Sequence, residues 1–399
     1  MLEQKQKCLI VWSADWPWDV RINKQIKSLL ASNFEVHILC RNSTYIEEEE
    51  VFENLRIHRI KNITKNIKLN NILTTPIYLN PLWAWHIFKI VRKVKPDLMI
   101  IRDIPLALSA IFFGKFFKSK IILDIAEHYP ALMKVNKKYI CNPIVKYLIC
   151  NLKMYDYIEK KAVKKVDSIL AVVKESKTRL IRDYNIDSKK IYIVSNTPEQ
   201  IPTKIEKNRI NDKLKIVYTG NVDGVFRGLH VLVEAAKILK NNKNIEFNII
   251  GDGSYLEEII NIKKQNNLEN VNILGRFSHV DLLKFLNTQD LGIIPHLSND
   301  VINYTIPNKL FDYMSYSLPV IVSSARPLKR IIEEENCGYV FEAGNSKDLA
   351  ETILQILKNK NNLEQKGKNG RQAIIKKYNW GNDEKIMISA IEYLIKNDC

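Results

Sequence analysis

Two doubly wound α/β domains are the fold that this sequence predicts, on three observations. The chain has 399 residues, more than one hydrophobic core usually serves. Short apolar runs alternate with amphipathic stretches of helical period, as parallel strands joined by helices do. A polar segment with two prolines, residues 198–213, divides this alternation into two series. We therefore expect one domain over residues 1–200, a second over 201–375, and a C-terminal helix over 376–399 that packs back toward the first.

The apolar runs place the strands of both domains. In the first half they cover residues 8–12, 34–39, 96–101, 120–125, 167–173 and 191–196. In the second half they cover residues 215–220, 245–251, 270–275, 290–295 and 318–323. Helical patterns lie between them, including residues 346–357, for which we expect Ser346 to be the N-cap. Such sheets bind ligands outside the carboxyl ends of their strands, which predicts a site in a cleft between the two domains.

The charge of the chain is strongly uneven. Its net charge is +17, and residues 51–150 alone hold 17 basic and 5 acidic side chains. Either an anionic partner or a solvated lysine-rich surface explains this excess, and composition leaves both open. The six cysteines have no metal-site spacing, and the apolar stretch 104–117 is too short to span a bilayer. With no secretory signal, we expect a cytoplasmic protein with reduced thiols.

Two stretches of the second half could hold a diphosphate. A strand ends at Gly220, and Arg227 and Gly228 follow at the start of a helix. Helix N-termini attract phosphates, and a guanidinium matches phosphate oxygens. The second stretch places Pro307 in a first helical turn together with Lys309, where an acid would be the usual choice. In isolation, a solvent-exposed arginine in a loop explains Arg227 better than a phosphate site does.

Further candidates lie beside these two stretches. Asp312, one turn after Lys309, could accept hydrogen bonds from ribose hydroxyls, although a solvated helix carboxylate would look the same in sequence. Arg276 and Phe277 follow the end of another predicted strand. Ser278 comes next and is the expected N-cap of the following helix. That loop could present backbone groups and a ring to a nucleobase.

These blocks together resemble the donor domain of the retaining family-4 glycosyltransferases, which have the GT-B fold of two Rossmann-like domains facing across a cleft. The matching run is YTG…RGL…IIGDG…NVNILGRFS…DLGIIP…PNKLFDYMSYSLPVIVS…CGYVFEAG. The resemblance also takes in residues 8–50 and extends over about 120–385.

The resemblance implies roles for individual residues. Arg227 and Lys309 would grip the donor diphosphate and stabilise the departing nucleotide. The positions that would bind the nucleotide are Gly220, Asn221, Gly228, Arg276, Phe277, Asn308 and Asp312. In the first half, residues 13–29 would approach the transferred sugar and the acceptor. Residues 122–130 resemble an Asp-x-His-Glu segment at the mouth of the cleft, with Asp124 and the catalytic candidate Glu127 retained.

Three positions depart from the family pattern. Tyr304 stands where the first Glu of a paired-glutamate motif would fall, Asn221 replaces a basic residue, and Ala126 replaces the His of Asp-x-His-Glu. These departures put the identity of the donor sugar in question and leave room for an inactive member. No Asp-x-Asp pair follows a strand end, and the family works without a divalent metal. We therefore expect no metal and no cofactor, because the nucleotide sugar is a substrate.

The resulting expectation is transfer of a sugar, with retention, from a UDP- or GDP-sugar to a lipid-linked or polysaccharide acceptor in cell-surface polysaccharide biosynthesis. A GT-B sugar-nucleotide epimerase is one alternative. A basic nucleic-acid-binding protein is the other, but no nucleic-acid module motif appears and we expect no such partner. The basic first half also suits an enzyme at the anionic inner face of the membrane. Its expected interfacial residues are Tyr147, Leu148, Tyr155 and Tyr157 with Lys134, Lys137, Lys138, Lys146 and Lys153.

Overall fold

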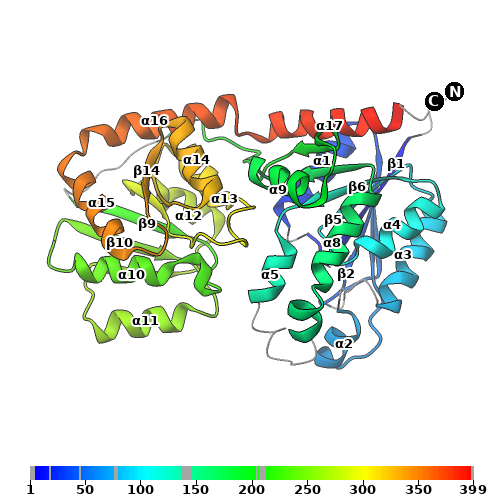
Figure 1. Ribbon diagram of the computed structural model, residues 1–399, viewed down its shortest axis with the longest axis horizontal. Coiled ribbons are helices and arrows are strands. Elements are labelled where there is room, and N and C mark those ends of the chain that lie inside the picture. The colour runs from blue at the N-terminus through cyan, green and yellow to red at the C-terminus, as the bar shows by residue number, and fades with distance from the viewer. Residues whose placement is uncertain are drawn as a thin grey trace. The chain divides into compact units, whose positions relative to one another are not determined.

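The computed structural model describes residues 5–17, 19–44, 46–75, 80–135, 146–203, 205 and 213–396. They form two compact units, one of Met1–Ser195 with Gly381–Cys399 and one of Asn196–Trp380 (Figure 1). Residues 204 and 206–212 of the expected linker lie outside the described ranges, as do Lys137 and Lys138. The C-terminal residues 381–399 thus belong to the same unit as the N-terminal half.

The first unit is built on one sheet of eight described strands. The strands are β1 (Lys7–Asp15), β2 (Glu35–Arg41), β3 (Glu49–Phe52), β4 (Leu55–Arg59), β5 (Leu98–Arg102), β6 (Lys120–Ile125), β7 (Ser168–Ala171) and β8 (Ile191–Ile193). Their order is β3-β4-β2-β1-β5-β6-β7-β8, and every neighbouring pair is parallel except β3 with β4. The six strands that the apolar runs predict are present. The pair β3 and β4 was not predicted, because its sequence is short and charged.

Helices cover this first sheet. They are α1 (Val20–Ala31), α2 (Ile67–Leu73), α3 (Pro81–Val94), α4 (Ala107–Phe116), α5 (Tyr129–Val135), η1 (Tyr147–Asn151), α8 (Met154–Lys165), α9 (Lys174–Tyr184), η2 (Ser188–Lys190) and α17 (Trp380–Lys396). Helices α3, α4 and α8 pack one against the next (Figure 1). Their inner faces join β1, β5 and β6 in one apolar core, since those strands are continuous apolar runs. None of the described helices combines the length and apolar character that crossing a bilayer requires.

The second unit repeats the design with a parallel sheet. Its described strands are β9 (Leu214–Thr219), β10 (Ile245–Ile250), β11 (Val271–Gly275), β12 (Leu291–Ile294), β13 (Val320–Ser323) and β14 (Gly338–Phe341). The order is β11-β10-β9-β12-β13-β14, so the chain reverses direction across the sheet between β9 and β12. Five of these strands match predicted runs. Strand β14, an edge strand of four residues, was not predicted from the apolar runs.

The helices of the second unit are η3 (Val225–Arg227), α10 (Leu229–Ile238), α11 (Leu256–Gln265), α12 (His279–Leu286), α13 (Asn308–Ser315), α14 (Arg326–Glu335), α15 (Ser346–Lys358) and α16 (Asn361–Lys376). The expected N-cap of α15 was wrong by one residue: Asn345 is the cap, and its side chain accepts from the backbone N–H groups of Lys347 and Asp348. The N-cap expected for α12 is confirmed, because Ser278 accepts from Asp281 N–H at 3.1 Å.

Candidate donor site

The carboxyl end of β9 is the topological switch point of the second sheet, with β10 on one side and β12 on the other. Ligands of open α/β sheets bind at such points. Gly220 follows β9 directly, and a cavity of about 490 Å³ opens beside it. Four of the predicted nucleotide-binding residues line this cavity, namely Gly220, Asn221, Arg276 and Phe277. The loops after β9, β10 and β11 therefore meet at one cavity. The other five donor-site candidates are not among its lining residues: Arg227, Gly228, Asn308, Lys309 and Asp312.

Helix α13 is held against β9 by a buried tyrosine. The hydroxyl of Tyr313 accepts the backbone N–H of Thr219 at 2.8 Å and lies 3.0 Å from the Thr219 Oγ1. Its ring also fills the space over Gly292 of β12, where an added methyl group would lie 2.3 Å from a ring carbon. This contact holds α13 against the end of β9 and so places the Lys309 side chain next to Gly220.

Lys309 is the most unusual side chain of the site. It is only 8% exposed, and its Nζ has no hydrogen-bond partner among the described residues. The Nζ lies 3.7 Å from the centre of the Tyr218 ring and packs against Gly220. Burial lowers the pKa of Lys309 well below its ordinary value, the charge of Arg227 lowers it further, and Asp312 opposes both. A buried amine without a partner is costly, and an anion bound beside it would remove that cost.

Arg227 ends the short helix η3 in front of α10. Its Nε donates to the Asp223 carbonyl at 3.2 Å, and its guanidinium lies 5.5 Å from the centre of the Phe226 ring. Gly228 follows with φ +70° as the N-cap residue of α10. An added Cβ there would lie 1.7 Å from the Pro295 carbonyl oxygen, so only glycine allows this close approach to the end of β12.

The N-termini of α10 and α13 are both uncapped. Neither helix has a capping side chain, and neither has an acidic residue in its first turn. The N-cap of α13 is Pro307, one position earlier than predicted, and Asn308 opens the helix with its side chain exposed. Free N–H groups and the positive ends of both helix dipoles remain available to an anion at these two starts.

His296 lies close enough to Lys309 and Arg227 for their charges to act on it, and it was not among the predicted site residues. It follows β12, is 1% exposed, and neither of its ring nitrogens has a hydrogen-bond partner among the described residues. Burial lowers its pKa well below the ordinary value, and the charges of Lys309 and Arg227 lower it further. The sequence could have indicated it, because His296 is a titratable residue directly after the predicted strand 290–295. It therefore lies at the carboxyl edge of the sheet, where the other candidates also lie.

The remaining nucleotide candidates are placed around this cluster. Asp312 is half-buried on α13, close enough for its charge to act on the pKa of Lys309. Phe277 meets the ring of Phe285 edge to face at 5.5 Å, which holds its ring in place, whereas Arg276 is exposed. Tyr304, where a glutamate was expected, is buried and presents no carboxylate.

In the first unit, Glu127 and Asp124 have different environments. Glu127 is exposed just after β6, as a residue that meets an acceptor should be. Asp124, the first residue of the segment that resembles Asp-x-His-Glu, has a side chain that is 0% exposed. It accepts from Arg21 at 2.6 Å and from Gln25 at 2.9 Å, both on α1. Asp124 therefore anchors α1 to the sheet, and its pKa is lowered by Arg21 against the effect of burial.

Asp103, directly after β5, is a buried carboxyl group that was not among the predicted site residues. Its pKa is raised to about 7, chiefly by burial and also by the charge of Glu127, while Arg102 opposes the shift. Its Oδ1 accepts the backbone N–H of Ala126 at 3.0 Å. The residue that replaces the expected histidine thus contributes a backbone hydrogen bond that ties the loop of Glu127 to β5.

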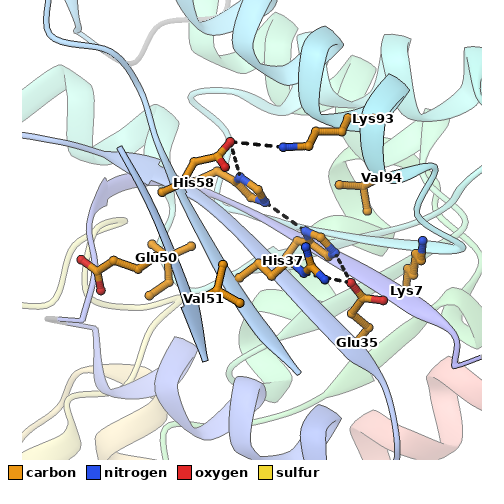
Figure 2. A pocket seen from close by; sticks show the side chains of 11 residues that line it. Lys7, Glu35, His37, Glu50, Val51, His58, Lys93 and Val94 are labelled. Atoms are coloured by element: carbon orange, nitrogen blue, oxygen red, sulfur yellow. Dashed lines mark hydrogen bonds and ion pairs between the residues drawn. The ribbon is translucent and has the colours of Figure 1, made fainter. Parts of the chain in front are cut away.

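A second polar cavity, of about 220 Å³, lies in the first unit among β2, β3, β4 and α3 (Figure 2). His37 Nδ1 lies 2.9 Å from His58 Nε2, and His37 Nε2 lies 3.1 Å from Glu35 Oε1. The pKa of His37 is lowered to about 4, chiefly by burial and also by the proximity of His58. None of the predicted site residues lines this cavity. Within the described ranges, no three His, Cys, Asp or Glu side chains gather where they could hold a metal ion.

Comparisons with known proteins agree with this geometry. The profile of the family described as "Glycosyl transferases group 1" matches residues 200–373, and that of "Glycosyltransferase Family 4" matches residues 20–197. Among solved structures, sucrose-phosphate synthase from Thermosynechococcus elongatus superposes with a TM-score of 0.77 at 14% identity, over 98% of this chain and 100% of that one. A glycosyltransferase from Rickettsia africae gives 0.69 at 17% identity, over 98% and 99%.

Sequence relatives agree as well. An uncharacterized glycosyltransferase of Methanocaldococcus jannaschii is 27% identical over 56% of this chain and 59% of its own length. The amylovoran biosynthesis glycosyltransferase of Erwinia amylovora is 26% identical over 40% and 39%. The chain thus spans about half the length of these relatives. Two doubly wound units, together with the solved structures that superpose on the chain, define a GT-B protein. This chain belongs to the family-4 glycosyltransferases.

Proposed function

We propose that the protein transfers a sugar, with retention of configuration, from a UDP- or GDP-sugar to a lipid-linked or polysaccharide acceptor in the cytoplasm. One observation carries the proposal: the buried amine of Lys309 has no hydrogen-bond partner among the described residues and lies at the carboxyl end of β9, near the charge of Arg227. A diphosphate is the ligand that would satisfy this amine and the two uncapped helix starts together.

The chemistry of the leaving group suits these residues. As the bond to the sugar breaks, negative charge develops on the departing nucleotide diphosphate. Lys309 and Arg227 would stabilise that charge without reorganising, which is how fixed positive groups accelerate such steps. Asp312 would accept from the ribose hydroxyls, and the loop of Arg276 and Phe277 would contact the base. In the first unit, Glu127 would contact the acceptor or the transferred sugar.

Proteins of similar fold and name support the class of substrate. The structure of HepE from Anabaena, which has a TM-score of 0.69 to this chain, was solved with UDP and glucose. Relatives in sequence carry names from surface-polymer synthesis, such as the capsular polysaccharide biosynthesis glycosyltransferase of Staphylococcus aureus. By analogy, we assign this chain to cell-surface polysaccharide biosynthesis.

The first experiment is a thermal-shift panel of UDP-, GDP- and ADP-sugars. A ligand at about 100 times its dissociation constant should stabilise its unit by ~2.7 kcal/mol. Arg227→Ala should then reduce sugar transfer by about 100-fold or more, the usual effect of losing one group that stabilises developing charge. Arg182→Ala is the matched control, because this arginine is exposed in the first unit and pairs with its neighbour Asp183. Activity of Arg227→Ala within threefold of the parent would remove it from the site.

Asp312→Ala tests the ribose contact separately. It should weaken the binding of free UDP or GDP, measured by calorimetry, and leave the unfolding transition in place. Unchanged affinity would mean that the ribose lies elsewhere. Incubation with sugar nucleotides in the absence of acceptor tests the chemistry, because an epimerised product would identify an epimerase and contradict transfer.

A further inference from the structure

An apolar groove with a basic border lies on the outer surface of the first unit. It has a volume of about 660 Å³ and runs between α4 and α8, which lie against each other (Figure 1). The groove is lined by Leu108, Ile111, Phe112, Lys115 and Phe116 of α4 and by Tyr157, Lys161 and Lys165 of α8. We call this set of eight residues the α4–α8 groove. It takes no part in the donor site, which belongs to the second unit.

The aromatic rings of this groove are exposed to an unusual degree. Phe112 is 65% exposed, Phe116 is 71% exposed and Tyr157 is 57% exposed. Phe112 and Phe116 lie four residues apart and therefore share one face of α4. Single exposed apolar side chains are ordinary, but a contiguous patch of large ones marks a surface that binds something.

The aromatic surface continues from α4 onto α3. The ring of Phe88 lies 5.8 Å from that of Trp85, which is 59% exposed, and 5.5 Å from that of Phe113. Phe113 in turn meets Phe112 edge to face at 5.1 Å. The rings thus form one connected band across two helices, which presents more area than a single peptide side chain would fill.

The charges on the helices that carry the band are mainly basic. Helices α3 and α4 contain no Asp or Glu, and they carry Lys89, Arg92, Lys93 and Lys115. Of these, Lys93 pairs with Glu49 of β3 at 3.4 Å. The two acidic residues of α8 are engaged elsewhere. Asp156 pairs with Lys134 at 3.0 Å, and Glu159 is buried against Arg179 at 2.6 Å. The exposed charge beside the rings therefore comes from lysine and arginine.

We propose that the α4–α8 groove and the adjoining rings of α3 bind the surface of an anionic lipid bilayer. Aromatic rings settle at the boundary between headgroups and acyl chains, and lysines beside them bind the phosphates. Both features are present on these helices, and the acidic residues near them are engaged by basic side chains: Asp156 by Lys134, Glu159 by Arg179 and Glu49 by Lys93. The surface is a function additional to sugar transfer, and does not depend on the identity of the donor.

The structure also revises the interfacial residues expected from the sequence. Tyr147, Leu148 and Tyr157 are exposed as expected. Tyr155 is buried in a small core with Ile104, Met133 and Ile158, so it was wrongly assigned to the interface. The exposed aromatic side chains of α3 and α4 take its place.

The test is co-sedimentation with vesicles of phosphatidylcholine alone or with phosphatidylglycerol. The parent protein should pellet with the anionic vesicles at low salt and lose most of this binding at high salt, where charges are screened within a few ångströms. The double variant Phe112→Ser/Phe116→Ser should lower the partition coefficient at least tenfold. Lys161→Gln/Lys165→Gln should lower it by a similar factor, and only on anionic vesicles.

The control is Ile238→Ser/Val280→Ser, which removes two exposed apolar side chains from the second unit and should leave partitioning unchanged. Thermal unfolding and UDP binding of each variant show that its fold and donor site are intact. Equal pelleting of the parent and both groove variants would overturn the proposal, as would absence of parent binding to anionic vesicles. A dimer in solution that Phe112→Ser/Phe116→Ser disperses would overturn it in favour of a second copy of the chain.

Discussion

Replacing Lys309 by methionine should separate the stability of the donor unit from its affinity for nucleotides. The substitution keeps the length and apolar body of the side chain and removes the buried amine, which has no hydrogen-bond partner in the part of the chain that the structure describes. An unsatisfied buried donor costs roughly 1–3 kcal/mol. The contact of Nζ with the Tyr218 ring at 3.7 Å returns about 0.5–2 kcal/mol while the amine is charged. The free protein should therefore gain about 1 kcal/mol in unfolding free energy.

The bound state should respond in the opposite direction. A hydrogen bond to a charged group contributes roughly 1.5–3 kcal/mol, so Lys309→Met should weaken UDP or GDP binding about ten- to a hundredfold. Burial and Arg227 lower the pKa of Lys309 in the free protein, and a bound diphosphate would raise it again. Binding should therefore take up protons, and this uptake should decrease in the variant.

The assays are urea unfolding of the second unit and calorimetry of UDP binding in two buffers of different ionisation heat. Lys240→Met, at an exposed position beyond α10, is the matched control and should change neither quantity. A loss of more than about 2 kcal/mol of stability with unchanged UDP affinity would refute the reasoning, because Lys309 would then serve the fold alone.

Three further expectations follow from particular contacts. Gly228→Ala should destabilise the second unit by about 2 kcal/mol or more and weaken UDP binding, since φ is +70° and the methyl group would meet the Pro295 carbonyl. Urea unfolding measures the stability and calorimetry measures the UDP affinity. A variant with unchanged stability and affinity would show that the close approach to Pro295 is dispensable. Arg179→Met should cost roughly 3–5 kcal/mol of unfolding free energy, because it leaves Glu159 buried without its ion pair; a loss below 1 kcal/mol would contradict this. The low pKa of His37, about 4 against an ordinary 6.5, means that the unfolded chain binds this proton first, so stability should fall as pH drops from about 6.5 to 4. His37→Gln should flatten that dependence in unfolding curves taken at several pH values, and an equally steep curve would reject the assignment.

The sequence determined the architecture because parallel strands buried on both faces leave continuous apolar runs. All eleven predicted strands appear, and the missed ones, β3, β4 and β14, lie at or beside sheet edges. Edge strands are short and partly exposed, so local hydrophobicity does not distinguish them from loops. Four of the nucleotide-binding candidates, Gly220, Asn221, Arg276 and Phe277, line one cavity, and their role in binding stays a prediction.

Tertiary structure alone decided which polar groups are free to act. Asp124 and Glu127 are three residues apart in sequence, yet Asp124 is fully buried against Arg21 and Gln25 of α1, whereas Glu127 is exposed beyond the end of β6. His296 and Lys309 are thirteen residues apart, and only the pairing of β12 beside β9 gives them a shared environment. The periodicity of helices and strands is a local property, so it can be read from the sequence. The burial and the partners of a polar side chain depend on residues distant in the chain, so they can be read only from the tertiary structure.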